Sequence, residues 1–236
     1  MENGLNGKVV AVTGGFGSLG MATAQLLAER GARVALIGRS AAPDAAALPG
    51  ALAGALCLAG VDLVEAQAAQ AACATLNERL GGLDALVNVA GAFRWETIGQ
   101  GDARTWDLMF DLNVKTALNA SKAALPYLVK SGAGRVVNIG AGAGLKAGLG
   151  TGAYSASKAG VARLTEALAE ELKDKGVTVN AILPSVIDTP QNRADMPDAD
   201  FTRWVQAREI ATVIAFLLSE DARAITGALI PVNGRV

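Results

Sequence analysis

The sequence contains no histidine, only 4% aromatic residues and only two cysteines, Cys57 and Cys73, which form no CxxC pair. Without histidine, a Ser-His-Asp triad, histidine acid–base chemistry and nearly all catalytic zinc sites are excluded, so we expect no metal. Two isolated cysteines are typical of a protein that keeps them reduced and buried, which is the behaviour expected of cytoplasmic proteins.

Positive charge is not in excess, because 21 Lys and Arg residues face 22 Asp and Glu residues. Nucleic acids and anionic membrane surfaces require clustered positive charge, so we expect neither as a partner. The longest apolar run, GALAGALCLAGV (50–61), is too short and glycine-rich to span a bilayer. The opening MENGLNGKVV lacks the pattern of a secretory signal. These features predict a cytoplasmic protein that acts on a small molecule.

A length of 236 residues with 51% hydrophobic residues suits a single α/β domain over 1–236. Short β-branched runs alternate with longer helical patterns. Strands are predicted at 8–12, 33–37, 54–58, 83–88, 135–139, 177–183 and 227–232, and helices at 18–30, 64–80, 103–130, 153–175 and 207–218. We expect Pro126 to kink the long helix or to loosen its last turn.

The predicted strands are apolar on both faces and are separated by helices, which indicates a parallel sheet covered on both sides. The expected fold is therefore a three-layer α/β/α Rossmann fold with a doubly wound, mostly parallel, seven-stranded sheet. Segment 184–206 contains three prolines, so we predict that it is irregular and forms a substrate-binding loop.

The stretch TGGFGSLG (13–20) lies between the first strand and the first helix. Glycines at this position let the backbone approach a pyrophosphate, and the helix N-terminus offers free N–H groups to it. A purely structural turn is the alternative. We predict a dinucleotide cradle formed by Gly14, Gly15, Phe16, Gly17, Ser18, Leu19 and Gly20.

The second predicted strand ends in Gly38-Arg39-Ser40, where an NAD-binding protein carries an acidic residue that bonds the ribose. The carboxylate is missing, and the planar guanidinium of Arg39 can pair with a 2′-phosphate. We therefore predict NADP as cofactor, with NADPH preferred over NADH. The alternative is that Arg39 is a solvated loop residue.

Seven motifs, in this order, resemble the short-chain dehydrogenase/reductase family over nearly the whole chain. They are TGGFGSLG (13–20), VDL (61–63), NVAG (88–91), LNV (112–114), YSASK (154–158), NAILPSVIDTP (180–190) and ITGALIPVNG (225–234). The resemblance implies an NAD(P)-dependent oxidoreductase that forms a homodimer or homotetramer through the helices at 103–130 and 153–175.

The same resemblance implies roles for individual residues. Tyr154 and Lys158 would be the catalytic pair, and Asn113 would hold a proton-relay water through a local helix distortion. The cofactor would contact Tyr154 and Lys158 as well, together with Asp62, Leu63, Asn88, Ala90, Gly91, Pro184, Ile187 and Thr189.

Three positions depart from the family pattern. Ser18 replaces the middle glycine of the glycine loop, and Val89 replaces the second asparagine of the NNAG motif. Ala141 stands thirteen residues before Tyr154, where the family has its catalytic serine. The segment 183–204 resembles the dihydropteridine reductases, members of the family that also have alanine there, although they carry the NAD-type acidic residue where this chain has Gly38.

Tyr154 and Lys158 are four residues apart and so share one helix face. A nearby ammonium and the positive nicotinamide ring of the oxidised cofactor favour the phenolate, so we expect the pKa of Tyr154 to fall below its usual value of about 10. Ala141 offers no hydroxyl to an oxyanion, and the loss of one such donor costs about 10²–10³ in rate. Thr151 is either a substitute donor or the cap of its helix, and we favour the cap.

These observations predict hydride transfer from NADPH to a small, planar or activated acceptor such as a quinonoid dihydropterin, with Tyr154 as general acid. Trp95 and Trp204 are candidate walls for a planar ring, although both are equally compatible with the core. One alternative is a reductase of ketones or 3-oxoacyl thioesters, in which Thr151 or water replaces the serine. Another is a non-catalytic NADP-binding module.

Overall fold

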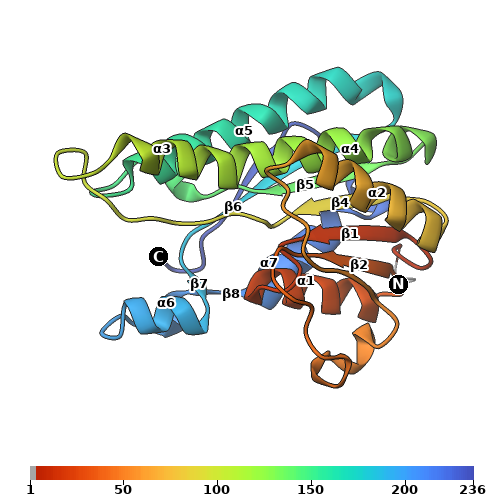
Figure 1. The fold of residues 1–236 in the computed structure, drawn as a ribbon, viewed down its shortest axis with the longest axis horizontal. Coiled ribbons are helices and arrows are strands. Elements are labelled where there is room, and N and C mark those ends of the chain that lie inside the picture. The colour runs from red at the N-terminus through yellow and green to blue at the C-terminus, as the bar shows by residue number, and fades with distance from the viewer. Residues whose placement is uncertain (1–3) are drawn as a thin grey trace.

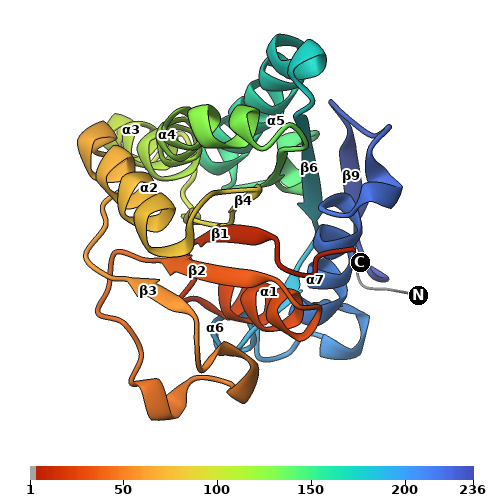
Figure 2. The same cartoon turned by 90° about the vertical axis from the view of Figure 1, so that its right-hand side faces the viewer.

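A parallel sheet forms the centre of the structure, a computed structural model that describes residues 4–236. Within this range, seven strands lie in the order β3-β2-β1-β4-β5-β6-β9, and every neighbouring pair is parallel (Figure 2). The strands are β1 (Val9–Thr13), β2 (Arg33–Ile37), β3 (Leu56–Leu58), β4 (Ala85–Asn88), β5 (Arg135–Ile139), β6 (Thr178–Pro184) and β9 (Leu229–Val232). This order confirms the predicted doubly wound sheet.

Helices cover both faces of the sheet (Figure 1). The α-helices of the described residues are α1 (Ser18–Glu29), α2 (Ala66–Leu80), α3 (Ala103–Phe110), α4 (Thr116–Lys130), α5 (Gly152–Leu172), α6 (Pro190–Asp195) and α7 (Ala207–Leu217). The helices α1 and α7 lie on one face, while α2, α4 and α5 lie on the other. Across the described residues 4–236, no helix has the length and the apolar character needed to span a membrane.

Alternate residues of each strand face opposite layers, so the protein has two hydrophobic cores. Val10 and Val12 of β1 pack on the side of α1 and α7, whereas Val9 and Ala11 pack on the side of α2, α4 and α5. This division explains why the strands read as apolar on both faces. Alanine supplies much of the helical surface in both cores, so few aromatic residues are needed.

A buried polar chain ties two helices to the middle of the sheet. Asn88 of β4 donates to Asn138 of β5 at 2.9 Å and to Ser121 of α4 at 3.0 Å. Asn138 in turn donates to Thr165 of α5 at 2.9 Å. All four side chains are buried, so each bond is made away from competing water. This buried polar chain of hydrogen-bonded side chains therefore fixes the position of α5 relative to β5.

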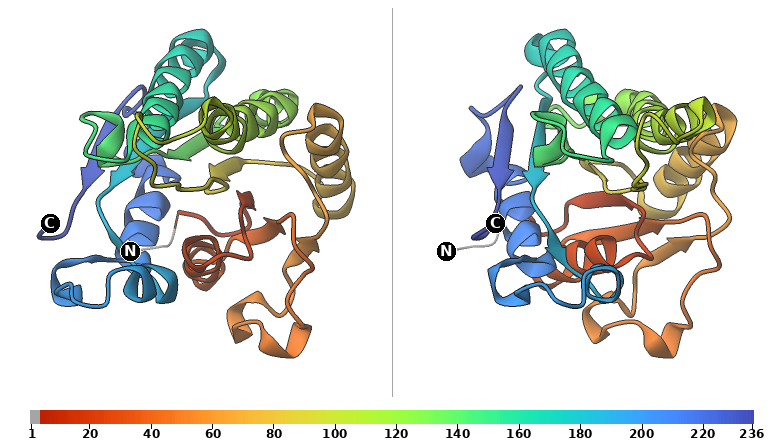
Figure 3. Two further views of the ribbon diagram at one scale, coloured as in Figure 1. Left: turned by 60° about the vertical axis from the view of Figure 1, so that its left-hand side comes forward. Right: turned by 90° about the vertical axis from the view of Figure 1, so that its left-hand side faces the viewer.

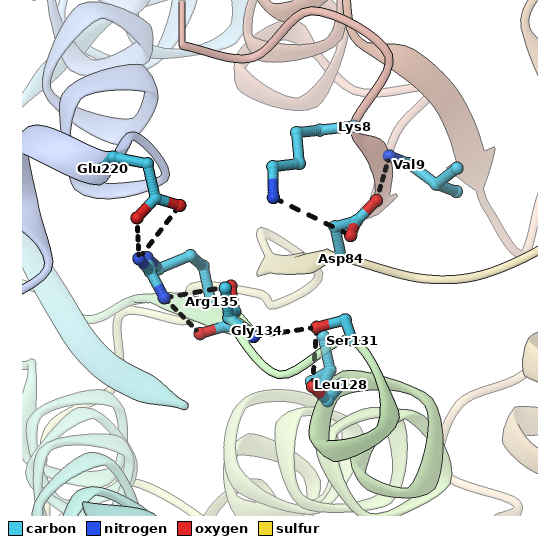
Figure 4. A network of polar contacts seen from close by, with 9 residues as sticks. Lys8, Val9, Asp84, Leu128, Ser131, Gly134, Arg135 and Glu220 are labelled. Carbon is cyan, nitrogen blue, oxygen red and sulfur yellow. Dashed lines mark hydrogen bonds and ion pairs between the residues drawn. The ribbon is translucent and has the colours of Figure 1, made fainter. Parts of the chain in front are cut away.

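A second polar network lies at the amino ends of β1, β4 and β5 (Figure 4). Asp84 accepts a hydrogen bond from the Val9 amide at 2.8 Å, and Lys8 lies 4.0 Å from the same carboxylate. The buried Arg135 donates to the carbonyls of residues 133 and 134 and pairs with Glu220 at 3.4 Å. These contacts join the strand starts at the end of the sheet opposite the glycine loop.

The predicted helix at 103–130 is interrupted, but not at the proline. A π-helical turn, η3 (Asp111–Lys115), separates α3 from α4, and α4 continues through Pro126 to Lys130. The Ser131 amide donates to the Tyr127 carbonyl at 3.0 Å, so the last turn is not loosened. The expected effect of Pro126 is therefore wrong, since the extra residue inserted near Asn113 causes the distortion.

Segment 184–206 is more regular than expected. It contains α6 and the short strands β7 (Ile187–Asp188) and β8 (Val205–Gln206), which pair in parallel. Pro190 begins α6, where its missing N–H has no partner to lose, so the proline starts structure rather than breaking it.

The segments that follow the strand ends gather on one side of the molecule, which faces the viewer in the right panel of Figure 3. There the chain leaves β1 toward one face of the sheet and leaves β4 toward the other. Doubly wound sheets bind ligands at this switch in direction. The fold thus places the glycine loop, the turn after β4 and the start of α5 around one crevice.

Replacing Asn138 with Ala is expected to lower the free energy of unfolding by about 2–3 kcal/mol, because Thr165 and Asn88 each lose a buried partner. Urea denaturation followed by circular dichroism measures this loss. Asn77→Ala in α2 removes an amide outside the polar chain and is the control, with an expected change within about 0.5 kcal/mol. Equal effects of the two substitutions would contradict a stabilising role for the chain.

Candidate active site

The glycine loop between β1 and α1 is closely packed where it turns. Gly14 has a φ of 61°, and a Cβ on it would lie 2.9 Å from the Ala90 backbone. A Cβ on Gly20 would lie 2.2 Å from the Gly14 carbonyl oxygen. Only glycine fits these two positions. The packing leaves the α1 N-terminus open beside the loop, with Gly17 at the N-cap and no acidic residue in the first turn.

Two neighbouring cavities follow the loop along the carboxyl ends of the strands. One of about 540 Å³ is lined by Gly14, Phe16, Gly17, Ser18, Leu19, Gly20, Gly38, Arg39, Ser40, Val89, Ala90, Gly91 and Thr189. The other, of about 220 Å³, is lined by Gly14, Ile37, Gly38, Arg39, Val61, Asp62, Leu63, Ala90, Gly91, Ala92, Leu112 and Thr116. The structure thus brings most of the predicted cofactor residues together.

These cavities fit a dinucleotide. Glycine leaves backbone N–H groups accessible where a Cβ would block them, and a helix N-terminus attracts phosphate. Asp62 and Leu63, both predicted to contact the cofactor, line the smaller cavity. The sequence analysis missed Ala92, Leu112 and Thr116, which reach the cavity only because η3 turns beside β4.

Four predicted cofactor residues lie elsewhere. The Asn88 side chain points into the buried polar chain rather than into a cavity, because β4 directs it toward α4 and β5. Gly15 packs against Leu36 of β2, and Pro184 is buried where β6 pairs with β9. Ile187 packs against the hydrophobic core. None of these four residues lines either of the two cavities.

Asn113 lies at the centre of the π-helical turn, which confirms the local distortion inferred for this position. Its side-chain oxygen accepts from the Ala92 amide at 2.9 Å, and its nitrogen donates to the Ala92 carbonyl at 3.0 Å and to Ser157 at 2.9 Å. A Cβ on Gly91 would lie 2.5 Å from the Asn113 oxygen. Asn113 therefore fixes the turn after β4 against α5.

Tyr154 and Lys158 lie on adjacent turns of α5, with the Lys158 ammonium 5.9 Å from the Tyr154 ring centroid. The ammonium is buried and donates to the Ile139 carbonyl at 2.8 Å. Burial lowers the pKa of Lys158 to about 8 and raises the pKa of Tyr154 to about 12. The expected fall in the Tyr154 pKa is thus wrong for the protein alone, because desolvation outweighs the nearby charge.

Ala141 is buried at the end of β5, where the family's serine would stand. Thr151 does not supply the missing donor. Its hydroxyl bonds to the Gly148 amide and carbonyl at 2.9 and 3.0 Å and to Ser155 at 3.0 Å. Thr151 is the N-cap residue of α5, which confirms the position preferred for it, but its side chain makes no capping hydrogen bond.

The two tryptophans proposed as substrate walls have different environments. Trp204 is 6% exposed and packs against Phe201 at 4.7 Å, so it belongs to the core. Trp95 is 58% exposed and lies over Gly150, where a Cβ would meet its indole at 2.2 Å. Phe93, which the sequence analysis missed, contacts the Tyr154 ring edge-on at 4.9 Å. Phe93 and Trp95 thus form an exposed aromatic border beside Tyr154.

The loop that carries Ile187 and Thr189 is held by a charged cluster. Asp188 accepts two hydrogen bonds from Arg193, at 2.6 and 2.7 Å, and one from Gln206 at 2.8 Å. These donors lower the pKa of Asp188 to about 2. Arg193 also lies 4.8 Å from the centroid of Phe201. The contacts join β7, α6 and β8 into one unit beside the larger cavity.

A dinucleotide cradle beside a half-buried tyrosine and a buried lysine is typical of a nicotinamide-dependent oxidoreductase, and similar proteins agree. Residues 8–200 match the short chain dehydrogenase family. The 3-oxoacyl-(acyl-carrier-protein) reductase of Vibrio harveyi is 34% identical over 98% of this chain and 97% of its own length. The 2-(S)-hydroxypropyl-CoM dehydrogenase 3 of Xanthobacter autotrophicus is 33% identical over 99% and 98%.

A solved structure has the same architecture. Carveol dehydrogenase from Mycobacterium avium, in complex with NAD, superposes with a TM-score of 0.86 at 28% identity over 98% of each chain. The chain belongs to the short-chain dehydrogenase/reductase family and is an NAD(P)-dependent oxidoreductase.

The burial of Lys158 predicts a pH-dependent stability of the cofactor-free protein. Its folded pKa is about 8 against an ordinary 10.5. Between these values the unfolded chain holds a proton that the folded protein has released, so rising pH favours the folded state. The free energy of unfolding of the wild type, relative to Lys158→Met, should rise by up to about 3 kcal/mol over this interval.

Urea denaturation of both proteins from about pH 7 to about pH 10.5 tests this, because ionisations common to both cancel in the difference. The exposed Lys122→Met in α4 is the control and should show no such rise. If the difference in free energy of unfolding between the wild type and Lys158→Met did not change with pH, burial would not lower the pKa of Lys158.

Proposed function

We propose that the protein reduces a small, activated acceptor with NADPH, using Tyr154 as the proton donor. The observation that carries this proposal is the pair of half-buried Tyr154 and buried Lys158 beside the dinucleotide cradle, with Ala141 in place of a hydroxyl. When bound, the cofactor supplies the hydride. The protein's own residues bind it, orient the acceptor and deliver the proton.

The proton lies on the Tyr154 hydroxyl at neutral pH, because burial raises the pKa of this group to about 12. The protonated phenol is the proton donor when the reaction runs in the direction of reduction. Lys158 keeps a positive charge nearby below about pH 8, and this charge stabilises the phenolate that donation leaves behind. Asn113 acts as a positioning residue, since it holds the turn after β4 against α5.

We infer an activated acceptor because neither Ala141 nor Thr151 offers a second hydrogen-bond donor to an oxyanion. Ala141 carries no hydroxyl, and the Thr151 hydroxyl is already bonded to Gly148 and Ser155. A ketone would lose about 10²–10³ in rate from one missing donor. A quinonoid dihydropterin needs a proton on nitrogen rather than a stabilised oxyanion, and its flat ring matches the border formed by Phe93 and Trp95.

The relatives support a second candidate substrate, a 3-oxoacyl thioester. The Vibrio harveyi protein, 34% identical to this chain, is a 3-oxoacyl reductase. In that case a water would replace the serine hydroxyl at Ala141. A non-catalytic NADP-binding module is less well supported, because binding alone does not require a half-buried tyrosine and a buried lysine on one helix face.

The preference for NADP rests on Arg39, which lines both cavities at the end of β2.

A homodimer or homotetramer formed through α3, α4 and α5 is part of the proposal, and the exposed apolar side chains Trp106, Phe110 and Leu118 on these helices support it. We also propose that the protein acts in the cytoplasm on a small molecule, without nucleic acid or membrane as a partner.

NADPH oxidation with freshly generated quinonoid dihydropterin, beside an activated ketone at the same concentration, tests the substrate class. We expect turnover of the pterin above the non-enzymatic rate, and a loss of about 10²–10⁴ in Tyr154→Phe, which lacks the acidic proton. Tyr127→Phe in α4 is the matched control and should keep full activity. Turnover of the ketone alone would favour the second candidate, and silence with measurable NADPH binding would favour the binding module.

Restoring a hydroxyl at position 141 separates the two substrate classes. Ala141→Ser should raise ketone turnover by up to about 10²–10³, because it returns the missing donor. Its effect on the pterin should stay within about threefold, since that reaction builds no oxyanion. Steady-state kcat/KM for both acceptors measures the difference. An equal rise for both would contradict the idea that the site is adapted to an acceptor that needs no serine.

A further inference from the structure

We propose that Phe16 prevents the site from carrying the acidic side chain of an NAD-binding site at position 38, because its ring fills the space above Gly38 that this side chain would occupy. The inference rests on the proposed NADP preference and adds a steric cause to the attraction exerted by Arg39. It concerns the Phe16–Gly38 contact, which joins the glycine loop to the end of β2.

The contact is too close for any side chain at position 38. A Cβ on Gly38 would lie 2.3 Å from Phe16 Cδ2, 2.6 Å from Cε2 and 3.0 Å from Cγ. Cγ is the first ring atom, so a rotation about the Cβ–Cγ bond cannot relieve the overlap. An aspartate or glutamate at position 38 therefore requires Phe16 to leave its place.

The backbone is held on both sides of the contact, so only a rotation about the Phe16 Cα–Cβ bond would relieve the overlap. The Gly38 amide donates to the Leu58 carbonyl at 3.0 Å, and its carbonyl accepts from the Val61 amide at 3.1 Å. On the other side, the Gly15 amide donates to the Ile37 carbonyl at 3.0 Å, and Gly15 itself packs against Leu36. The backbones on both sides of the contact are thus bonded to the sheet. Phe16 also packs against the hydrophobic core, which holds its ring in place.

The chemistry of the larger cavity agrees with this exclusion. Its lining includes Arg39, Ser18 and Ser40 and contains no acidic residue. Asp62 lies in the neighbouring cavity, and its carboxylate already accepts from the Val64 amide at 3.0 Å. A ribose with free hydroxyls therefore meets no carboxylate at the end of β2, whereas a 2′-phosphate meets the Arg39 guanidinium.

Binding measurements on four proteins test the proposal: the wild type, Gly38→Asp, Phe16→Ala and the double variant. Isothermal titration calorimetry gives Kd for NADP⁺ and NAD⁺, and thermal denaturation without cofactor gives Tm. We expect Gly38→Asp alone to lower Tm and to weaken binding of both dinucleotides. The double variant should recover Tm and bind NAD⁺ at least about tenfold more tightly than Gly38→Asp.

Phe16→Ala alone should keep the preference for NADP⁺, because Arg39 remains, while Arg39→Ala should lose it. Phe216→Ala, an exposed aromatic residue on α7, is the control for loss of a phenyl ring. If neither aspartate variant folds, Gly38→Ala with and without Phe16→Ala provides the same steric comparison through Tm. The proposal predicts that Gly38→Ala lowers Tm and that the second substitution restores it.

Two outcomes would overturn different statements. If Gly38→Asp alone melts like the wild type and binds NAD⁺ as tightly as the double variant, Phe16 does not exclude the acidic side chain. If the wild type binds NAD⁺ and NADP⁺ equally well, the proposed NADP preference is wrong. The comparison between the single and double variants then still decides whether Phe16 blocks an acidic residue at position 38.

Discussion

The structure depends on the close backbone approach at the switch between β1 and β4. Gly14 lies against the Ala90 backbone, and Gly20 lies against Gly14, at separations that exclude any Cβ. This contact allows one chain segment to turn toward α1 and the other to turn toward η3 without filling the crevice between them. The two cavities along the strand ends and the position of Asn113 both follow from that divergence.

The electrostatics of the site follow from burial more than from pairing. Lys158 is a buried ammonium whose hydrogen bond is to a backbone carbonyl rather than to a carboxylate. Its pKa is therefore depressed while that of Tyr154 is raised, and the protein alone keeps the phenol protonated. Because the buried Lys158 ammonium is poorly solvated, it favours binding of a negatively charged ligand or a reaction that leaves negative charge on Tyr154.

The parallel sheet covered on both sides was predictable because the apolar runs at 8–12 and 33–37 face a core on each side. The family motif correctly predicted the helix distortion at Asn113. Helix propensity alone instead predicted a disturbance at Pro126, where α4 continues without a break. The Tyr154 pKa was mispredicted because the spacing reports the nearby charge but not the depth of burial. The hydrogen bonds of Thr151 and the burial of Trp204 depend on tertiary packing that single positions do not encode.

The departures from the family pattern preserve packing while changing chemistry. Ala141 keeps the buried end of β5 filled but removes a hydroxyl, and Gly38 leaves room for Phe16 while removing a carboxylate. One change lies where the acceptor would be activated and the other where the cofactor would be recognised. Neither disturbs the glycine turn or the buried polar chain. The proposed changes in acceptor and in cofactor preference thus lie at two ends of one scaffold.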